Sequence, residues 1–532
     1  MRARFRFFVD FLLLALFAFL AAAAHAAGVQ EVAYPARLTV HLRNALPIEG
    51  KRGKPPAEAL APLTLLFFGW TAAHPAVTAR SGDREVGAVC TSSHRAGDSY
   101  EVAVDLTIDN KHPLESGKGS IALRLNLNGT LASGSFDGQF NDVPVSGSAQ
   151  AVIAYEVEFP AFGRGLRMWL PRSSEQVRAV LLWGNGALGD SRDIVFTPYV
   201  EAYAAANRLA VVATSQFGMR IREGEGNLIV AALGMFAKES GHPEIEHAPL
   251  LLTGHSNGGD MAYEFNAWLP ARVVAYTISK GGVYESYDNL SDQALSTPAV
   301  LAAGEIDQPF RVEAIRRIFF TNRPRGAPIS LIVEQDQGHT WNQSVPLYLV
   351  TMQHALDERL DANASAAHGP VQLKPVDESR AWLADNSTWK NGITAIYPAG
   401  HYPGKAGRVK DASWLIDQDA AMIYRGIATY NDPLKLALAG NHGPVYGSNE
   451  PLLLTCADFG AGEWKSVKVY DGATLLGEIS RDNPTLTVPG PHPLGAHGAV
   501  LVGELPDGTL RTSQPVEWIV APDDVLPEND PQ

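Results

Sequence analysis

The segment PLLLTGHSNGGDMAYEFNAWL, residues 249–269, decides the fold. Its first five residues are mainly apolar and predict a buried strand, and the apolar residues after Gly258 recur at helical spacing. Between them, Gly254-His255-Ser256-Asn257-Gly258 fits the pattern G-x-S-x-G. Between a strand and a helix, this pattern predicts a sharp turn that projects the serine hydroxyl from the carboxyl edge of a sheet. The segment therefore predicts Ser256 as a nucleophile.

Short apolar runs and helical patterns alternate on both sides of this segment. The runs that predict strands are Ala179–Trp183, Leu209–Ala213, Pro249–Thr253, Val273–Ile278, Ala299–Ala303 and Ile329–Val333. The patterns that predict helices are Phe196–Asn207, Asn227–Glu239, Gly258–Leu269 and Arg311–Phe320. Strands that are apolar throughout are covered on both faces, so this region is predicted to be an α/β domain with a mostly parallel sheet wrapped by helices.

Two further residues complete a catalytic hypothesis. A serine hydroxyl is a weak nucleophile and needs a base to take its proton. Asp307 follows the predicted strand at 299–303, and His339 follows the last predicted strand. A histidine there can swing over the serine, and the acid can reach its ring. We therefore predict Ser256 as the nucleophile, His339 as general base and then general acid, and Asp307 as the group that orients His339.

Each assignment has an alternative. Glu305 is the next choice after Asp307 for the acid, whereas Asp336 is only three residues from His339 on the same loop and has a poor reach. His339 itself has the alternative of an ordinary surface histidine. His255 is expected to be structural, because its place beside the nucleophile points its ring away from the serine.

The loop after the strand at 179–183 reads Gly184-Asn185-Gly186-Ala187-Leu188-Gly189 and matches G-x-G-x-x-G, a dinucleotide-binding pattern. Such a site needs an acid after the next strand, which leads instead to Thr214-Ser215-Gln216. The loop therefore fits an oxyanion hole better. We predict the backbone N–H groups of Asn257 and Asn185 as its donors, with Gly186 as the alternative to Asn185, and no cofactor.

The first residues resemble an export signal. Arg2, Arg4 and Arg6 form a basic region, an apolar run of 14 residues extends from Phe11 to Ala24, and Ala24-His25-Ala26 fits a cleavage site. Residues 1–26 are therefore predicted to be a signal peptide, with an uncleaved anchor as the alternative. No second long apolar stretch follows, so we expect a secreted or periplasmic protein without a membrane span after cleavage.

Composition excludes several classes of protein. The 532 residues carry 43 Lys and Arg against 57 Asp and Glu, a net charge of −14, and no long basic run, which argues against nucleic acid as a partner. Two cysteines, Cys90 and Cys456, exclude a disulfide scaffold and a cysteine-built metal cluster, although the sequence leaves open whether they pair. No H-E-x-x-H motif occurs, and no metal site is predicted.

Alternating apolar and polar residues predict β-rich domains on both sides of the α/β region. Residues 27–160 are predicted to form an N-terminal all-β domain. Residues 161–432 hold the α/β domain and an extension with a helix at Gln418–Tyr430. Residues 433–522 are predicted to form an immunoglobulin-like β-sandwich, followed by an acidic disordered tail at 523–532. The strands expected in the sandwich are Leu434–Leu438, Leu452–Cys456, Val467–Tyr470, Ala499–Gly503 and Val516–Val520.

With these residues in place, the chain resembles the α/β-hydrolase superfamily, in particular secreted bacterial esterases of the feruloyl/acetylxylan-esterase and polyhydroxybutyrate-depolymerase-like group. The resemblance lies in Gly254–Gly258, the Asp307 loop and Gly338-His339, and covers about 200 of the 532 residues. It implies an α/β-hydrolase domain that cleaves carboxylic esters through an acyl-enzyme. Many relatives carry His-Gly where this chain has Trp183-Gly184, and the α/β region lacks a cysteine pair, so the subfamily is left open.

Two other functions compete with an exported serine esterase. One is a serine peptidase, because the same triad serves peptidases of this fold. The other is a non-catalytic surface or glycan-binding protein, suggested by the two β-rich domains. The sequence leaves open the acyl and alcohol parts of the substrate, whether polysaccharide ester, polyester or small ester, together with the role of the β-rich domains and the oligomeric state.

Overall fold

The structure is a computed structural model. It describes residues 37–42, 63–68, 76–81, 84–96, 99–108, 117–126, 131–140, 143–171, 176–218, 220–282, 284, 290–341, 343–388, 393–403, 411–429, 433–439 and 443–523. The predicted signal peptide and all but the first residue of the predicted tail lie outside the described residues. Among the residues described, no helix combines the length and the apolar character needed to cross a membrane.

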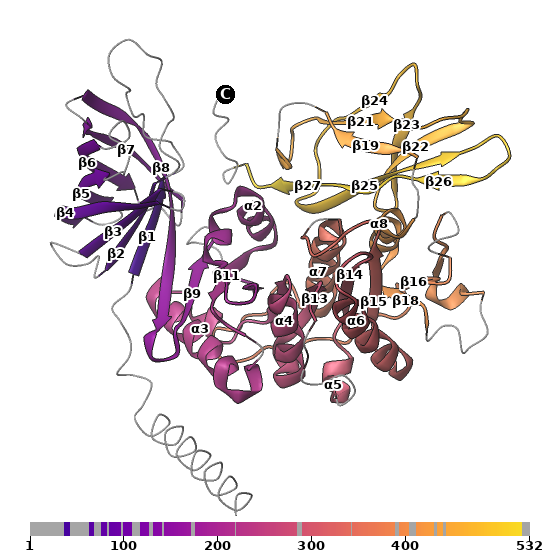
Figure 1. The fold of residues 1–532 in the computed structure, drawn as a ribbon, viewed down its shortest axis with the longest axis horizontal. Helices are drawn as coiled ribbons and strands as arrows, with labels where there is room; N and C mark the ends of the chain where they lie inside the picture. Colours follow the sequence, from indigo (N-terminus) through magenta and orange to yellow (C-terminus); the bar gives the residue numbers. More distant parts are fainter. Residues whose placement is uncertain are drawn as a thin grey trace, which may run out of the picture.

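The central sheet has the strand order β8-β9-β11-β10-β12-β13-β14-β15. Strands β11 to β15 run parallel along this order, whereas β9 is antiparallel to both of its neighbours. This order with one antiparallel strand is the α/β-hydrolase fold (Figure 1). The strands are β8 (Val143–Phe159), β9 (Arg164–Trp169), β10 (Ala179–Gly184), β11 (Leu209–Ser215), β12 (Leu250–Gly254), β13 (Val273–Ser279), β14 (Ala299–Gly304) and β15 (Ile329–Glu334).

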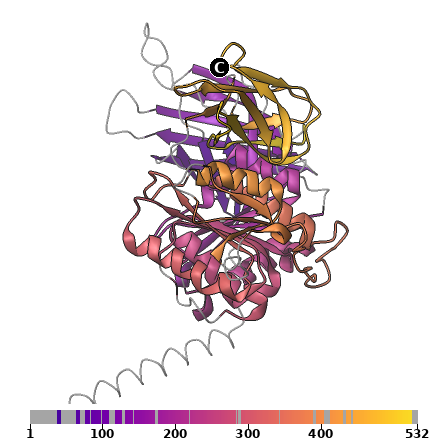
Figure 2. The ribbon, with the colours of Figure 1, turned by 90° about the vertical axis from the view of Figure 1, so that its right-hand side faces the viewer.

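Helices cover both faces of this sheet. One apolar core packs the sheet against α3, α4 and α6, and a second packs its other face against α2, α7 and α8. Figure 2 shows these helices with the strands between them. Every strand and helix predicted between residues 179 and 333 is confirmed, with ends shifted by a few residues at most. The helices are α2 (Pro198–Asn207), α3 (Gly226–Ser240), α4 (Asn257–Trp268), the short α5 (Asp292–Leu295), α6 (Pro309–Asn322), α7 (Val345–Arg359) and α8 (Gln418–Ala428).

The N-terminal strands form one antiparallel sheet that closes on itself, because β1 pairs with both β2 and β8. The 17-residue strand β8 belongs to this sheet through its pairing with β7, and its last residues, from Tyr155 to Phe159, pair with β9 of the central sheet. The two sheets therefore share a strand. The others are β1 (Arg37–Leu42), β2 (Leu63–Phe68), β3 (Ala76–Ser81), β4 (Arg84–Ala96), β5 (Ser99–Ile108), β6 (Gly117–Asn126) and β7 (Leu131–Phe140).

The C-terminal strands form two sheets that share one apolar core. One sheet is β19-β21-β24, and the other has the order β20-β27-β25-β22-β23 with β26 beside β25. This unit lies on the α/β domain, with β27 against α2 and β25 against α7 (Figure 1). The strands are β19 (Lys435–Leu438), β20 (Val445–Gly447), β21 (Leu452–Asp458), β22 (Ser466–Asp471), β23 (Thr474–Ile479), β24 (Thr485–Val488), β25 (Gly495–Glu504), β26 (Leu510–Thr512) and β27 (Val516–Ala521).

A small three-stranded sheet, β17-β16-β18, is formed by the segment between α7 and the C-terminal unit along the chain and belongs to the predicted extension. Its strands are β16 (Trp382–Ala384), β17 (Ile396–Pro398) and β18 (Ser413–Leu415). Cys90 lies in β4 and Cys456 in β21, and both are free thiols. The question that the sequence left open is therefore answered: the two cysteines do not pair.

Candidate active site

The turn between β12 and α4 holds Ser256 in a backbone conformation that non-glycine residues rarely adopt, with φ 57° and ψ −126°. Two glycines let the chain bend this sharply. A Cβ on Gly258 would lie 2.4 Å from the carbonyl oxygen of Gly184, and one on Gly254 would lie 2.5 Å from the carbonyl carbon of Gly258. Strand β10, strand β12 and helix α4 can approach this closely only without those side chains. The predicted sharp turn is therefore present.

Asp307 and His339 meet on neighbouring loops after β14 and β15. His339 Nδ1 lies 2.9 Å from Asp307 Oδ2, and the Asp307 side chain is 2% exposed. The other oxygen of this carboxylate accepts a hydrogen bond from the Gln308 N–H. Glu305 has a different contact, because its Oε2 accepts the N–H of Asp336 at 3.3 Å. The structure thus pairs His339 with the acid that the sequence favoured.

Ser256 and His339 lie at the same edge of the sheet, but no hydrogen bond joins their side chains in this structure. The imidazole of His339 instead lies beside that of His255, with ring centroids 4.5 Å apart. Ser256 Oγ accepts a hydrogen bond from Nη1 of Arg311 at 3.5 Å. Catalytic hydrogen bonds are often long or absent without substrate and form in the bound complex. Arg311, which the sequence prediction missed, therefore lies in contact with Ser256.

His255 lies closer to the chemistry than predicted. Its Nδ1 lies 3.2 Å from Ser279 Oγ, which anchors the ring to the end of β13. Burial, together with the charges of His339 and Lys280, lowers the pKa of His255 to about 4. The ring is therefore neutral at neutral pH and acts as a wall of the site, whereas His339 is the histidine that contacts a carboxylate.

A buried ion pair supports the loop that carries His339. Lys280 follows β13, its side chain is fully buried, and it pairs with Glu334 at the end of β15. The same ammonium group donates to the carbonyl oxygen of Thr340, the residue after His339, and Glu334 accepts the Ser344 N–H at 2.9 Å. The pair thus connects both ends of the loop to the sheet. In the sequence, Lys280 is a charged residue directly after an apolar strand, and this signal could have identified it.

The prediction of Asn185 as an oxyanion donor is wrong. Its backbone N–H already donates to the buried Thr214 Oγ1 at 3.0 Å and is not available to an oxyanion. Its side chain instead fixes the loop, since Nδ2 donates to the carbonyl oxygen of Phe217 at 2.9 Å. The N–H of Gly186, the alternative donor, and that of Asn257, at the first position of α4, have no acceptor among the described residues.

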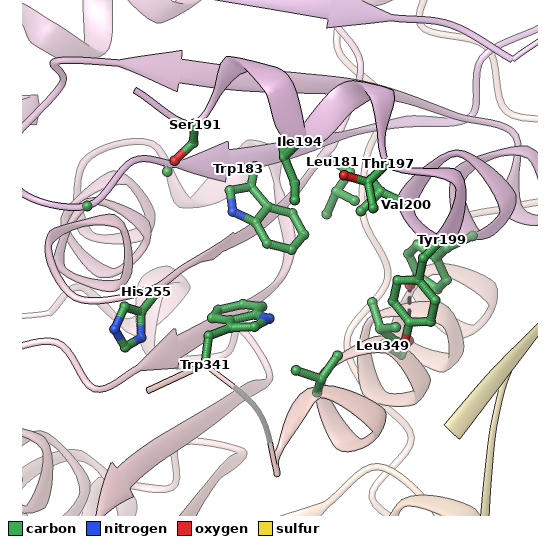
Figure 3. Close-up of a pocket in the computed structure, with 14 residues that line it drawn as sticks. Leu181, Trp183, Ser191, Ile194, Thr197, Tyr199, Val200, His255, Trp341 and Leu349 are labelled. Atoms are coloured by element: carbon green, nitrogen blue, oxygen red, sulfur yellow. Dashed lines mark hydrogen bonds between the residues drawn. The ribbon is translucent and has the colours of Figure 1, made fainter. Parts of the chain in front are cut away.

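An apolar cavity of about 370 Å³ opens beside the elbow. Trp183 and Trp341 pack against each other in its wall, with ring centroids 5.1 Å apart. In Figure 3, His255 lies at one end of the group, and Tyr199 and Leu349 lie at the other. The two tryptophans thus line the cavity, whereas Phe217, which follows β11, is 1% exposed and belongs to the core. The remaining lining residues are Leu181, Gly184, Gly186, Ser191, Ile194, Thr197, Val200, Tyr203 and Val345.

A second polar cluster lies away from this site, where α7 and α8 meet the C-terminal unit. The ligand atoms of His354, Asp417 and Asp419 lie within 4.8 Å of one another. Asp417 caps α8 by accepting the Ala420 N–H, and Asp419 accepts the Ala473 N–H from the C-terminal unit. Burial lowers the pKa of His354, but the hydrogen bond and charge of Asp417 outweigh it and raise that pKa overall. These contacts give the cluster a structural role in joining the units.

Parts of this chain resemble solved structures of esterases. Among solved structures, esterase PE8 is 20% identical over 33% of this chain and 91% of its own, with a TM-score of 0.26. A cold-adapted esterase from an Arctic intertidal metagenomic library is 15% identical over 51% and 98%, with a TM-score of 0.27. An acetyl xylan esterase from Aspergillus awamori is 11% identical over 35% and 94%, with a TM-score of 0.27. The chain matches no protein-family profile and no curated protein. The fold assignment rests on the strand order above.

Proposed function

We propose that this chain is an exported serine hydrolase that cleaves carboxylic esters through an acyl-enzyme intermediate. One observation carries the proposal: a serine in a strained turn lies at the same sheet edge as a histidine whose ring is held by a buried carboxylate. The proposal of export rests on the basic and apolar pattern of residues 1–26. The solved structures that resemble this chain are named as esterases, and the proposed function is of the same kind.

The residues have distinct roles in the proposed reaction. Ser256 Oγ attacks the ester carbonyl while His339 takes its proton, and Asp307 stabilises the imidazolium that forms. The N–H groups of Asn257 and Gly186 donate to the oxyanion of the tetrahedral intermediate. His339 then returns the proton to the leaving alcohol, which leaves an acyl group on Ser256. Water, activated by His339, releases the acid and restores the hydroxyl.

A labelling experiment tests the proposal. A fluorophosphonate probe should add once per chain, on the peptide that contains Ser256, and the protein should hydrolyse 4-nitrophenyl alkanoates faster than aminoacyl 4-nitroanilides. Faster cleavage of the anilides would favour a peptidase. A protein that takes no label and turns over no ester, yet binds glycans, would be the non-catalytic alternative.

The apolar cavity predicts which esters react best. We expect the cavity to receive the apolar group of the substrate, so Leu349→Trp, at the end far from His255, should block long chains and leave room for short ones. The ratio of kcat/KM for octanoyl to acetyl esters should fall about tenfold or more, because excluding about two CH₂ groups already forfeits on the order of 0.8 kcal/mol each, and about 1.4 kcal/mol corresponds to a factor of ten.

The control is Leu475→Trp, the same exchange at a side chain that is 51% exposed on β23. Its chain-length ratio should match that of the wild type. Ratios are measured in two series, one that varies the acyl group and one that varies the alcohol. If Leu349→Trp lowers kcat/KM equally for every chain length in both series, the cavity does not hold the apolar group.

A further inference from the structure

Arg311 is placed at the nucleophile with much of its hydrogen-bonding capacity unused. It lies in the first turn of α6, and its side chain is 23% exposed. Nη1 lies 3.5 Å from Ser256 Oγ, the outer limit of a hydrogen bond. Nε is buried and has no hydrogen-bond acceptor among the residues that the structure describes. The guanidinium also lies over the ring of Phe310, 5.0 Å from its centroid. Of its five N–H donors, the described residues thus engage one, in the long hydrogen bond to Ser256 Oγ.

The neighbouring carboxylate does not satisfy this guanidinium. Asp307 Oδ1 lies 3.9 Å from Arg311 Nε, too far for a hydrogen bond. Both oxygens of Asp307 already have partners, Oδ2 the ring of His339 and Oδ1 the N–H of Gln308. The buried Nε–H therefore has a distant carboxylate beside it but no hydrogen-bond acceptor, and an unsatisfied buried donor in a native structure calls for an explanation. A ligand that binds beside Ser256 supplies one.

We propose that Arg311 binds a carboxylate carried by the ester substrate, close to the scissile bond. The proposal rests on the function proposed above and narrows its substrate class to acidic esters. The planar fork of arginine matches a carboxylate and forms two parallel hydrogen bonds with it. Binding such a group would also draw Nη1 away from Ser256 Oγ, which leaves the hydroxyl to His339.

The position of Arg311 relative to the apolar cavity predicts a second feature of the substrate, an apolar group. Arg311 comes from α6, on one face of the sheet, whereas the apolar cavity is lined by α2 and α7, from the other face. Ser256 contacts Arg311, and His255, the residue before it, lines the apolar cavity. The substrate that fits both is an ester with an apolar group on one side of its carbonyl and a carboxylate on the other.

Matched pairs of substrates test this proposal. The first pair places the charge in the acyl part: the 4-nitrophenyl monoester of glutaric acid and its carboxamide analogue. The second places it in the alcohol part: butyryloxyacetate and butyryloxyacetamide. For each pair, the ratio of kcat/KM for the charged to the neutral ester is measured in the wild type, Arg311→Gln and Arg311→Lys. Arg316→Gln is the control, because it removes the same charge from an exposed position of α6.

The wild type should prefer the charged ester in at least one pair, and Arg311→Gln should lower that ratio about tenfold or more, because hydrogen bonds to charged groups are the strong ones. Arg311→Lys should retain part of the preference, and Arg316→Gln all of it. Added salt should weaken the preference of the wild type and leave that of Arg311→Gln unchanged.

Two outcomes would overturn the proposal. If Arg311→Gln lowers kcat/KM equally for charged and neutral esters, Arg311 serves Ser256 and not the substrate. If Arg311→Gln leaves kcat/KM unchanged for the charged and the neutral ester of both pairs, Arg311 binds no substrate carboxylate. Both outcomes leave the esterase function intact, because that function is judged separately by neutral-ester turnover and by fluorophosphonate labelling of the wild type. Thermal melting of each variant shows whether it is folded.

Discussion

Ser256→Ala is expected to lower kcat on short-chain 4-nitrophenyl esters about 10⁶-fold, the loss typical when a serine hydrolase loses its nucleophile. Alanine has no hydroxyl to acylate, so labelling by fluorophosphonate should also disappear. The melting temperature should change little, because alanine adopts the strained φ of 57° no more easily than serine. The measurement is the steady-state rate together with the mass of the labelled protein.

The control for this variant is Ser296→Ala, which removes an exposed hydroxyl at the end of α5. It should retain full activity and full labelling. If Ser256→Ala still hydrolyses esters at a wild-type rate, or still takes up the probe, then another residue is the nucleophile, and the proposed function has to be placed elsewhere on the chain.

Asp307→Asn has the second largest expected effect, a fall in kcat of about 10⁴-fold. The carboxylate accepts a hydrogen bond from His339 Nδ1, which keeps the proton off Nε2 and leaves that nitrogen free to act as a base. An asparagine can present its amide N–H to Nδ1 and so stabilise the wrong tautomer. Stopped-flow or steady-state kinetics on the same esters measure the loss, and labelling by the probe should slow in parallel.

The two alternative acids provide controls for this assignment. Asp336→Asn changes an exposed residue with φ 53°, a conformation that asparagine tolerates, and should stay within about threefold of the wild-type rate. Glu305→Gln should behave likewise, because its contact is with the Asp336 N–H. A loss of 10⁴-fold in either variant, with Asp307→Asn active, would transfer the orienting role to that acid.

The sequence predicted much of the α/β domain for a simple reason. Its parallel strands are buried on both faces, so each is an apolar run that stands out from its surroundings. The antiparallel strand β9 was missed, because Arg164 and Arg167 interrupt its apolar pattern, and Arg167 is buried in an ion pair with Glu156 of β8. Helix α7 was also missed. Its first eight residues, Val345–Met352, are all buried, because this part packs between the sheet and the C-terminal unit, and so they show no amphipathic period.

The placement of the site residues was predictable to a similar degree. Carboxyl ends of parallel strands meet at one edge, so residues after three such strands had to gather there, as Ser256, Asp307 and His339 do. The sequence does not show that the N–H of Asn185 is taken up by Thr214, because this contact depends on how the loop packs against a side chain of β11. Arg311 was missed for the same reason, since its contact with Ser256 is set by how α6 packs.

Strand β8 has a consequence for any shortened form of the protein. Its residues carry hydrogen bonds to the N-terminal sheet along most of their length and to β9 at their end. Removing residues 37–140 would therefore leave a long row of unpaired N–H and C=O groups at the border of the central sheet. Such unpaired edges recruit strands from other molecules, so the truncated protein would be prone to aggregation. The N-terminal strands thus cover the edge of the sheet in the α/β domain.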